Sequence, residues 1–150
     1  MADIISVYGK LLLEAMGQTL IMAFYSLIFA SIIGLIFGML SVLKSKVCNV
    51  IAQIFVDIIR GVPMIVLAFF VFFGIPYALK NFLHSTFTFT ALQAGIICLS
   101  LNCGAYMSEI IRAGIQSVDV GQMEAARSLG IPYWKAMHKV VLPQAIRTMI

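Results

Sequence analysis

Three long stretches without a single Asp, Glu, Lys or Arg limit what this chain can fold into. They run from Ala15 to Leu43, from Gly61 to Leu79 and from Asn81 to Ser108. A helix needs roughly 20 apolar residues to cross about 30 Å of lipid hydrocarbon, and each stretch is near or above that length. Apolar residues make up 62% of the chain and charged residues 11%, which is too apolar for an ordinary soluble domain. We therefore predict an all-α, polytopic membrane protein with at least three spanning helices.

The predicted organisation is a single transmembrane domain over residues 1–150. Its segments are an external interfacial lead-in (1–14), three spans (15–43, 61–79 and 89–112), a cytoplasmic loop (113–139) and the start of a further span (140–150). The first 20 residues lack the basic start, short apolar core and cleavage site of a signal peptide, so we expect the first span to be retained. The stretch from Val47 to Ile59 fits either the beginning of the second helix or a separate interfacial turn.

The distribution of Lys and Arg predicts the orientation of the chain. If the first span runs from outside to inside, only Lys10 and Lys80 lie outside, and the other eight lie inside: Lys44, Lys46, Arg60, Arg112, Arg127, Lys135, Lys139 and Arg147. By the positive-inside rule, the N-terminus is external and the loop over 113–139 is cytoplasmic. This spread along the chain also argues against a nucleic-acid-binding patch, despite the net charge of +4.

Small residues recur along the first span with a period of four. Ser26, Ala30, Gly34 and Gly38 fall on one ridge of a helix, where small side chains let a second helix approach closely. We predict a helix-packing face there.

Breaker residues interrupt the second predicted span at two places. Arg60-Gly61-Val62-Pro63 predicts a kink or break near the cytoplasmic membrane surface, and Arg60, Gly61 and Pro63 are candidate gating residues. A second group of breakers, from Gly74 to Tyr77, ends with a tyrosine of the kind found at membrane interfaces. We expect the chain to leave the membrane there and to form an external connection over residues 78–90.

The third span has a polar stripe. Asn102, Tyr106 and Glu109 recur at i, i+4 and i+7 and face the same way on a helix. Polar and ionisable side chains in a span normally face protein or water, so these residues are candidates for a solute path. Two structural alternatives remain: Glu109 can pair with Arg112, three residues away, and Asn102 and Tyr106 can hydrogen-bond a neighbouring helix.

No pattern in the chain predicts catalysis or metal binding. Cys48, Cys98 and Cys103 lack the paired spacing of a zinc site or a disulfide framework, and His84 has no second ligand at a suitable distance. The sequence pairs no nucleophile with a base and has no glycine-rich phosphate loop followed by lysine. We expect neither a catalytic residue nor a bound cofactor.

A polar, basic segment follows the third span and predicts an elbow of two short helices. Asp119 is suited to cap the first helix at its N-terminus, and Gly130 is suited to end it. A second helix can begin at Pro132, because proline fits the first turn of a helix. This helix would present Tyr133, Trp134, Met137 and Val141 to a partner groove.

The same segment has a recognisable motif. Glu124-Ala125-Ala126 is followed after three residues by Gly130, and nine residues later by a Val-x-Leu-Pro sequence ending in Leu142-Pro143. This order and spacing resemble the EAA loop of ABC importer permeases, with Val140 where isoleucine is usual. Two further stretches, Ile59 to Pro63 and Ala105 to Gln122, resemble the branch of the family that takes up polar amino acids such as histidine, glutamine, glutamate or arginine.

The resemblance covers the chain from about Gln18 onwards, and it implies a function and a set of partners. The loop would be the coupling helix that docks on a separate ABC ATPase, with Gly121 among its residues, and the ATPase would bind the ATP and Mg. Further partners would be a second permease copy or paralogue, an external solute-binding protein, the amino acid and the bilayer of a prokaryotic cytoplasmic membrane. Such permeases usually have five spans, two of them after the loop, so we expect the chain to be truncated. A scaffold or sensor without transport, or an importer of another small solute such as a metal or a peptide, remains an alternative.

Overall fold

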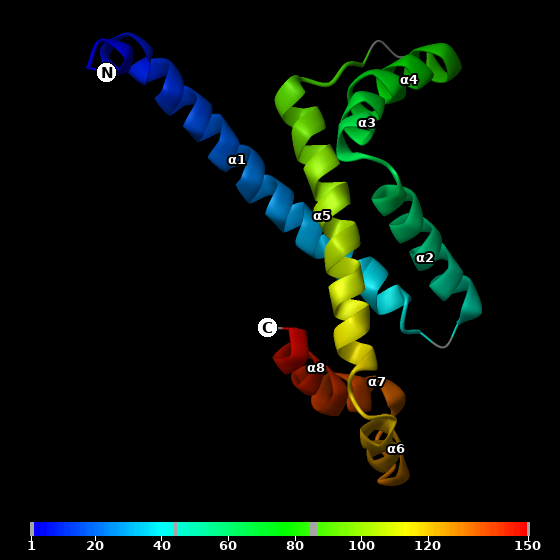
Figure 1. The fold of residues 1–150 in the computed structure, drawn as a ribbon. Helices are drawn as coiled ribbons and strands as arrows, with labels where there is room; N and C mark the ends of the chain where they lie inside the picture. The colour runs from blue at the N-terminus through cyan, green and yellow to red at the C-terminus, as the bar shows by residue number, and fades with distance from the viewer. Residues whose placement is uncertain (1, 44, 85–86, 150) are drawn as a thin grey trace.

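The computed structural model describes residues 2–43, 45–84 and 87–149, and every regular element in these ranges is helical (Figure 1). Predictions that fall on Met1, Lys44, Ser85, Thr86 or Ile150 lie outside the described residues. The elements in chain order are α1 (Ala2–Leu40), α2 (Lys46–Gly61), α3 (Met64–Phe69), η1 (Phe70–Gly74), α4 (Ile75–Leu83), α5 (Ala91–Gln116), α6 (Val120–Ser128), α7 (Tyr133–Ala136), η2 (Met137–Val141) and α8 (Leu142–Met149).

Three helical segments are long and apolar enough to cross a membrane. They are Tyr8–Leu40, Met64–Phe82 and Ala91–Gln116. The all-α fold with three spanning helices is therefore confirmed. The first of these belongs to α1, which is continuous from Ala2, so residues 2–14 of the predicted lead-in and the first span form one helix.

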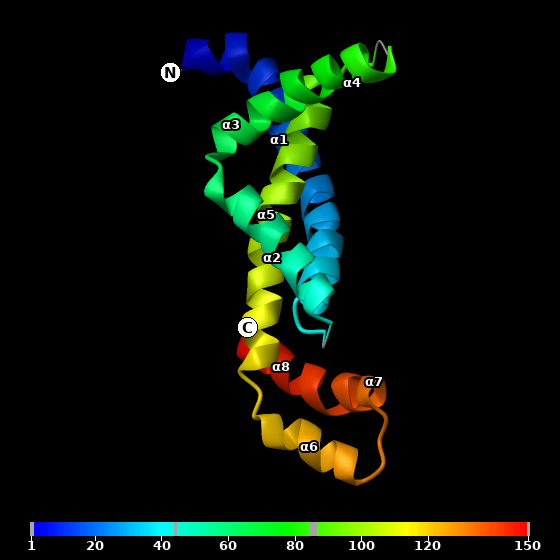
Figure 2. The same cartoon turned by 90° about the vertical axis from the view of Figure 1, so that its right-hand side faces the viewer.

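The most extensive interface between two helices is that of α1 with α5, which cross in Figure 1 and run side by side in Figure 2. The ridge of small residues in α1 lies in this contact: Ser26, Ala30, Gly34 and Gly38 are all buried. A Cβ atom added to Gly34 would lie 2.6 Å from Cβ of Met107 on α5. The absence of side chains therefore allows the two helices to pack at this distance.

A break separates α2 from α3, as predicted. Gly61 ends α2, Val62 is extended (φ −98°, ψ 130°), and Pro63 precedes the first residue of α3. The break lies beside α5: Sγ of Cys98 is 3.7 Å from the carbonyl oxygen of Met64, the residue that follows Pro63. On the other side of the break, Arg60 lies 3.8 Å from Glu109 of α5. The location of the break near the cytoplasmic membrane surface stays a prediction. Residues 47–59 belong to α2, so they form a helix rather than a separate turn.

The breaker residues Gly74–Tyr77 do not end the helix, which continues to Leu83; that the chain leaves the membrane near these residues stays a prediction. The physical reason is the π-helical turn η1, in which the N–H of Ile75 bonds to the carbonyl of Phe70, five residues back. Pro76 has no N–H to donate, and the wider turn accommodates it without ending the helix. The chain leaves this helix at His84, which has a left-handed backbone conformation (φ 51°).

The second π-helical turn, η2, also lies two residues before a proline. The N–H of Leu142 bonds to the carbonyl of Met137, and Pro143 follows as the second residue of α8. Because η2 keeps the helix continuous, α7, η2 and α8 form one bent helical segment across the end of the bundle (Figure 2). The residues predicted to begin a further span, 140–149, belong to the end of this segment.

Candidate functional site

The elbow after α5 begins and ends as the sequence predicted. A side-chain oxygen of Asp119 accepts a hydrogen bond from the N–H of Gly121 at 2.7 Å and caps α6. At the other end, Gly130 has a φ of +79°, a conformation that favours glycine. The N–H of Ile131 bonds back to the carbonyl of Ala126 at 3.2 Å, which closes the end of α6. The chain then turns through Pro132 into α7.

The inner face of the elbow packs on the chain itself. Ile115 at the end of α5 forms a buried cluster with Met137, Val141 and Ala145. The prediction that Met137 and Val141 face a partner is therefore wrong: both are about 95% buried, with exposed fractions of 5% and 4%. They are buried because η2 folds back against the end of α5, a tertiary contact that the helical pattern alone does not specify.

The three residues of the Glu-Ala-Ala motif divide between the two faces of α6. Ala126 is buried and faces the chain, whereas Glu124 and Ala125 are exposed. The small size of Ala126 serves the packing of α6 within the elbow. The free surface of α6 is therefore centred on Glu124 and Ala125, and exposed Leu129 extends it to the glycine turn.

Two polar contacts tie α8 to the rest of the elbow. Nε2 of Gln144 donates to Oε1 of Gln122 on α6 at 3.3 Å, and the hydroxyls of Ser117 and Thr148 lie 3.0 Å apart. Gln144 directly follows the motif residues Leu142 and Pro143, which place it opposite α6. These contacts and the buried cluster connect α6, α8 and the end of α5 into one unit.

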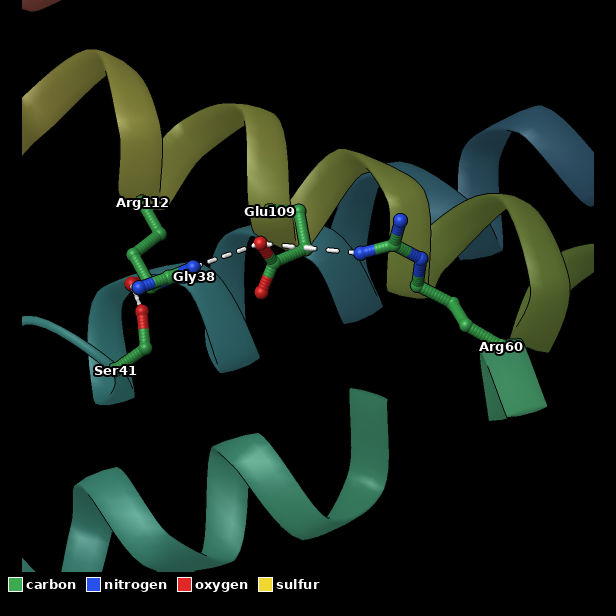
Figure 3. A network of polar contacts seen from close by, with 5 residues as sticks. All are labelled: Gly38, Ser41, Arg60, Glu109 and Arg112. Carbon is green, nitrogen blue, oxygen red and sulfur yellow. Dashed lines mark hydrogen bonds and ion pairs between the residues drawn. The ribbon is translucent and has the colours of Figure 1, made fainter. Parts of the chain in front are cut away.

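A polar network joins α2 to α5 (Figure 3). Oε2 of Glu109 accepts a hydrogen bond from Arg112 at 2.9 Å, and it lies 3.8 Å from a guanidinium nitrogen of Arg60. The guanidinium of Arg60 also lies over the ring of Tyr106, 4.9 Å from its centroid. The Glu109–Arg112 pair was foreseen as an alternative, and the structure contains it.

The part played by Arg60 could not be predicted from its position in the sequence. It was singled out because it precedes the break at Gly61 and Pro63, but nothing in the sequence placed it against Glu109. The charge of Arg60 and the polar stripe on α5 were the only signals for this contact. The structure thus connects two groups of candidate residues, the helix break and the polar stripe. Asn102 lies one turn before Tyr106 and is half-buried.

Among the residues that the structure describes, no group of three or more His, Cys, Asp or Glu could hold a metal ion.

Comparison with known proteins gives the context of these features. The family described as "Binding-protein-dependent transport system inner membrane component" matches residues 30–150. The probable amino-acid ABC transporter permease protein YckA of Bacillus subtilis (strain 168) is 38% identical over 135 residues, which are 90% of this chain and 57% of that protein. The putative glutamine transport system permease protein GlnP of Rickettsia prowazekii (strain Madrid E) is 41% identical over 146 residues, or 95% of this chain and 63% of that protein.

A solved structure has the same arrangement of helices. It is described as the crystal structure of an amino acid ABC transporter with histidines, and it matches 97% of this chain with a TM-score of 0.80 and 34% identity. The match covers 64% of that protein's chain. The chain thus spans less than two thirds of the length of these relatives.

Proposed function

This chain belongs to the family of inner membrane components of binding-protein-dependent transport systems, and we propose that it is a permease subunit of an ATP-driven importer of polar amino acids. The observation that supports this most directly is the two-sided elbow. Its inner face is packed on the end of α5, and its outer face leaves Glu124 and Ala125 free for a partner. The names of the similar proteins, which mention amino acids and glutamine, support the substrate class.

In this proposal, α6 docks on a separate ABC ATPase that binds ATP and Mg and hydrolyses the nucleotide. Displacement of α6 reaches α5 through the buried cluster of Ile115, Met137 and Val141, because a close-packed contact transmits movement between its two sides. The permease itself provides no catalytic residue and binds no cofactor. Its role is to change between arrangements of the spanning helices, with each ATPase state favouring one of them.

The solute path follows the polar side of α5. Asn102, Tyr106 and Glu109 offer an amide, a phenol and a carboxylate, which are groups that can hydrogen-bond the polar parts of an amino acid. Arg60 lies at the helix break and contacts both Tyr106 and Glu109, so movement at Gly61–Pro63 changes this side of the path. The break is therefore the proposed gate.

The remaining partners follow from the same proposal. The permease pairs with a second copy or a paralogue, receives the amino acid from an external solute-binding protein, and lies in the cytoplasmic membrane of a prokaryote. The N-terminus is external and the elbow is cytoplasmic, in agreement with the positive-inside rule.

The test is transport by the full-length protein in proteoliposomes that contain its ATPase, with the binding protein on the outer side. We expect ATP-dependent accumulation of one or more polar amino acids. Glu124→Ala should uncouple uptake and weaken association with the ATPase. Glu14→Ala removes another exposed carboxylate, at the other end of the molecule, and should change neither. Uptake of no amino acid by the intact assembly would contradict the proposal.

The path has a separate test. Asn102→Ala and Tyr106→Phe should alter the KM or the maximal rate of uptake while leaving ATPase association intact, because neither residue is in the elbow. Ala23→Ser, which adds a hydroxyl to an exposed position of α1, is a control with no expected effect. Unchanged kinetics in both α5 variants would remove these residues from the path.

A further inference from the structure

The second helical segment of the elbow has an exposed surface of its own, distinct from that of α6. This surface, called the Trp134 surface below, consists of four neighbouring exposed side chains at positions i, i+1, i+4 and i+5: Trp134, Lys135, His138 and Lys139. The side chain of Trp134 is large and apolar, yet the residue is 54% exposed. On the opposite side of the same helical segment, Ala136 and Met137 are buried in the elbow.

Charge divides the elbow into two parts. Residues 133–149 contain Lys135, Lys139 and Arg147 and no Asp or Glu. The acidic residues of the elbow, Asp119 and Glu124, lie at the beginning of α6 and within it. The charges of the Trp134 surface are therefore all positive, whereas the exposed face of α6 has charges of both signs, with Glu124 and Arg127.

The two parts also lie at different levels. In Figures 1 and 2, α6 is farther from the spanning helices than the segment made by α7, η2 and α8. Figure 2 shows this segment running across the end of the bundle, with α7 lying to one side of the end of α1. When the three spans cross the hydrocarbon, a segment that crosses the end of their bundle lies near the level where hydrocarbon gives way to headgroups and water.

These observations fit one partner. Tryptophan favours the boundary between lipid and water, because its ring is apolar and its N–H is polar. Lysine stems can lie along apolar surface while their ammonium groups reach the headgroups, and basic side chains next to a bilayer attract anionic lipids. We propose that the Trp134 surface binds the headgroups of anionic phospholipids in the leaflet on the side of the elbow.

This lipid contact would fix the depth of the elbow relative to the bilayer. Lipid contact at α7 and η2 holds this segment in the interface, so that α6 projects into the water on its far side. The proposal requires only that the protein lies in a bilayer, so it does not depend on which solute is carried.

Trp134 is the single tryptophan in these 150 residues and reports directly on its surroundings. The experiment places the full-length protein in nanodiscs, with any tryptophan outside residues 1–150 replaced by phenylalanine. The discs contain phosphatidylcholine and the anionic lipid phosphatidylglycerol. Two preparations are compared: in one, only phosphatidylcholine has bromine atoms on its acyl chains near the glycerol, and in the other, only phosphatidylglycerol has them. Bromine quenches tryptophan fluorescence on contact, so the difference between the preparations measures which lipid lies beside Trp134.

We expect quenching in both preparations, with stronger quenching by the brominated anionic lipid at equal mole fraction. Each of Lys135→Gln and Lys139→Gln should lower the preference for the anionic lipid about fivefold, the ratio that corresponds to one basic residue near a charged membrane surface. Lys10→Gln, an exposed lysine at the other end of the molecule, is the matched control and should leave the preference unchanged.

Three outcomes would overturn the proposal. Absence of quenching by either lipid would place Trp134 outside the bilayer. Equal quenching by both lipids, unaffected by the lysine variants, would show insertion without recognition of charge. A shift of Trp134 emission on addition of the ATPase, in discs where neither lipid quenches, would assign the surface to the ATPase instead.

Discussion

The α1–α5 interface and the elbow of α6 to α8 both depend on glycine and alanine, but for different physical reasons. At the interface, Gly34 and Gly38 are buried against α5 on a regular helix, and what matters is the space that a side chain would occupy. In the elbow, Gly130 has nothing near its missing Cβ, and what matters is its backbone φ of +79°. The ridge of small residues in α1 is buried along its whole length, whereas the elbow packs one face on the chain and leaves the other face exposed.

This difference shows that a small residue in the sequence does not by itself indicate its role. Ala126 and Ala125 are neighbours in one motif, yet the first is buried within the chain and the second is available to a partner. Substitutions at matched positions in the two regions therefore distinguish three roles of a small residue: leaving space for a packed helix, adopting a positive φ, and contacting a partner.

The largest effect is expected at the α1–α5 interface. Gly34→Leu should destabilise the protein by about 3 kcal/mol, because its Cβ atom alone would meet Cβ of Met107 at 2.6 Å and the helices would have to separate. Gly17→Leu, in the same helix with nothing within 4 Å of the added Cβ, should be neutral or slightly stabilising. The midpoint of thermal unfolding in detergent measures both, and equal midpoints would show that α1 and α5 are not closely packed at Gly34.

The next effect distinguishes the two faces of α6. Ala126→Leu should destabilise the elbow by about 1–3 kcal/mol, because a buried side chain has no room for extra methylene groups. Ala125→Leu should change stability by less than about 0.5 kcal/mol and instead weaken association with the ATPase. Hydrogen exchange of the α6 amides and a pull-down with the ATPase measure the two effects. If Ala125→Leu instead destabilised the elbow and Ala126→Leu weakened association with the ATPase, Ala125 would be the buried alanine.

A smaller effect is expected where only backbone conformation matters. Gly130→Ala should cost about 1–2 kcal/mol, since residues other than glycine are strained at positive φ. Gly61→Ala is the control, because the added Cβ would also meet nothing within 4 Å and its φ is not positive. Amide exchange over α6 and α7 should increase only in the Gly130 variant. If both variants behaved alike, a positive φ at Gly130 would be ruled out.

The smallest effect concerns the cap of α6. Asp119→Ala should destabilise this helix by about 0.5–1 kcal/mol, because the N–H of Gly121 loses its partner at 2.7 Å. Asp119→Asn keeps an oxygen that can accept this bond and should retain most of the stability. Exchange of the Gly121 amide gives the measurement. Equal exchange in the wild type and the Asp119→Ala variant would mean that the cap is not formed in solution.

The parts of the fold that follow from local chemistry were predicted from the sequence. Asp119 caps α6, Gly130 ends it, and Gly61 with Pro63 breaks the helix, since each of these depends on residues close together in the chain. The continuation of the helix through Pro76 was missed, because it depends on the π-helical turn that precedes the proline. The contact of Arg60 with Glu109 was also missed, because these residues are far apart in the sequence and meet only when α2 packs on α5.

The sequence by itself determined that the chain spans a membrane with helices, because backbone polar groups in lipid must be satisfied within the helix and the side chains around them must be apolar. It also determined where the elbow turns, because capping and positive φ are properties of single residues. Only the tertiary structure decided which face of each helix is free. Met137, Val141 and Ala126 face inward and Trp134 and Ala125 outward because η2 folds back on the end of α5, and a helical repeat does not specify which of its sides will meet another helix.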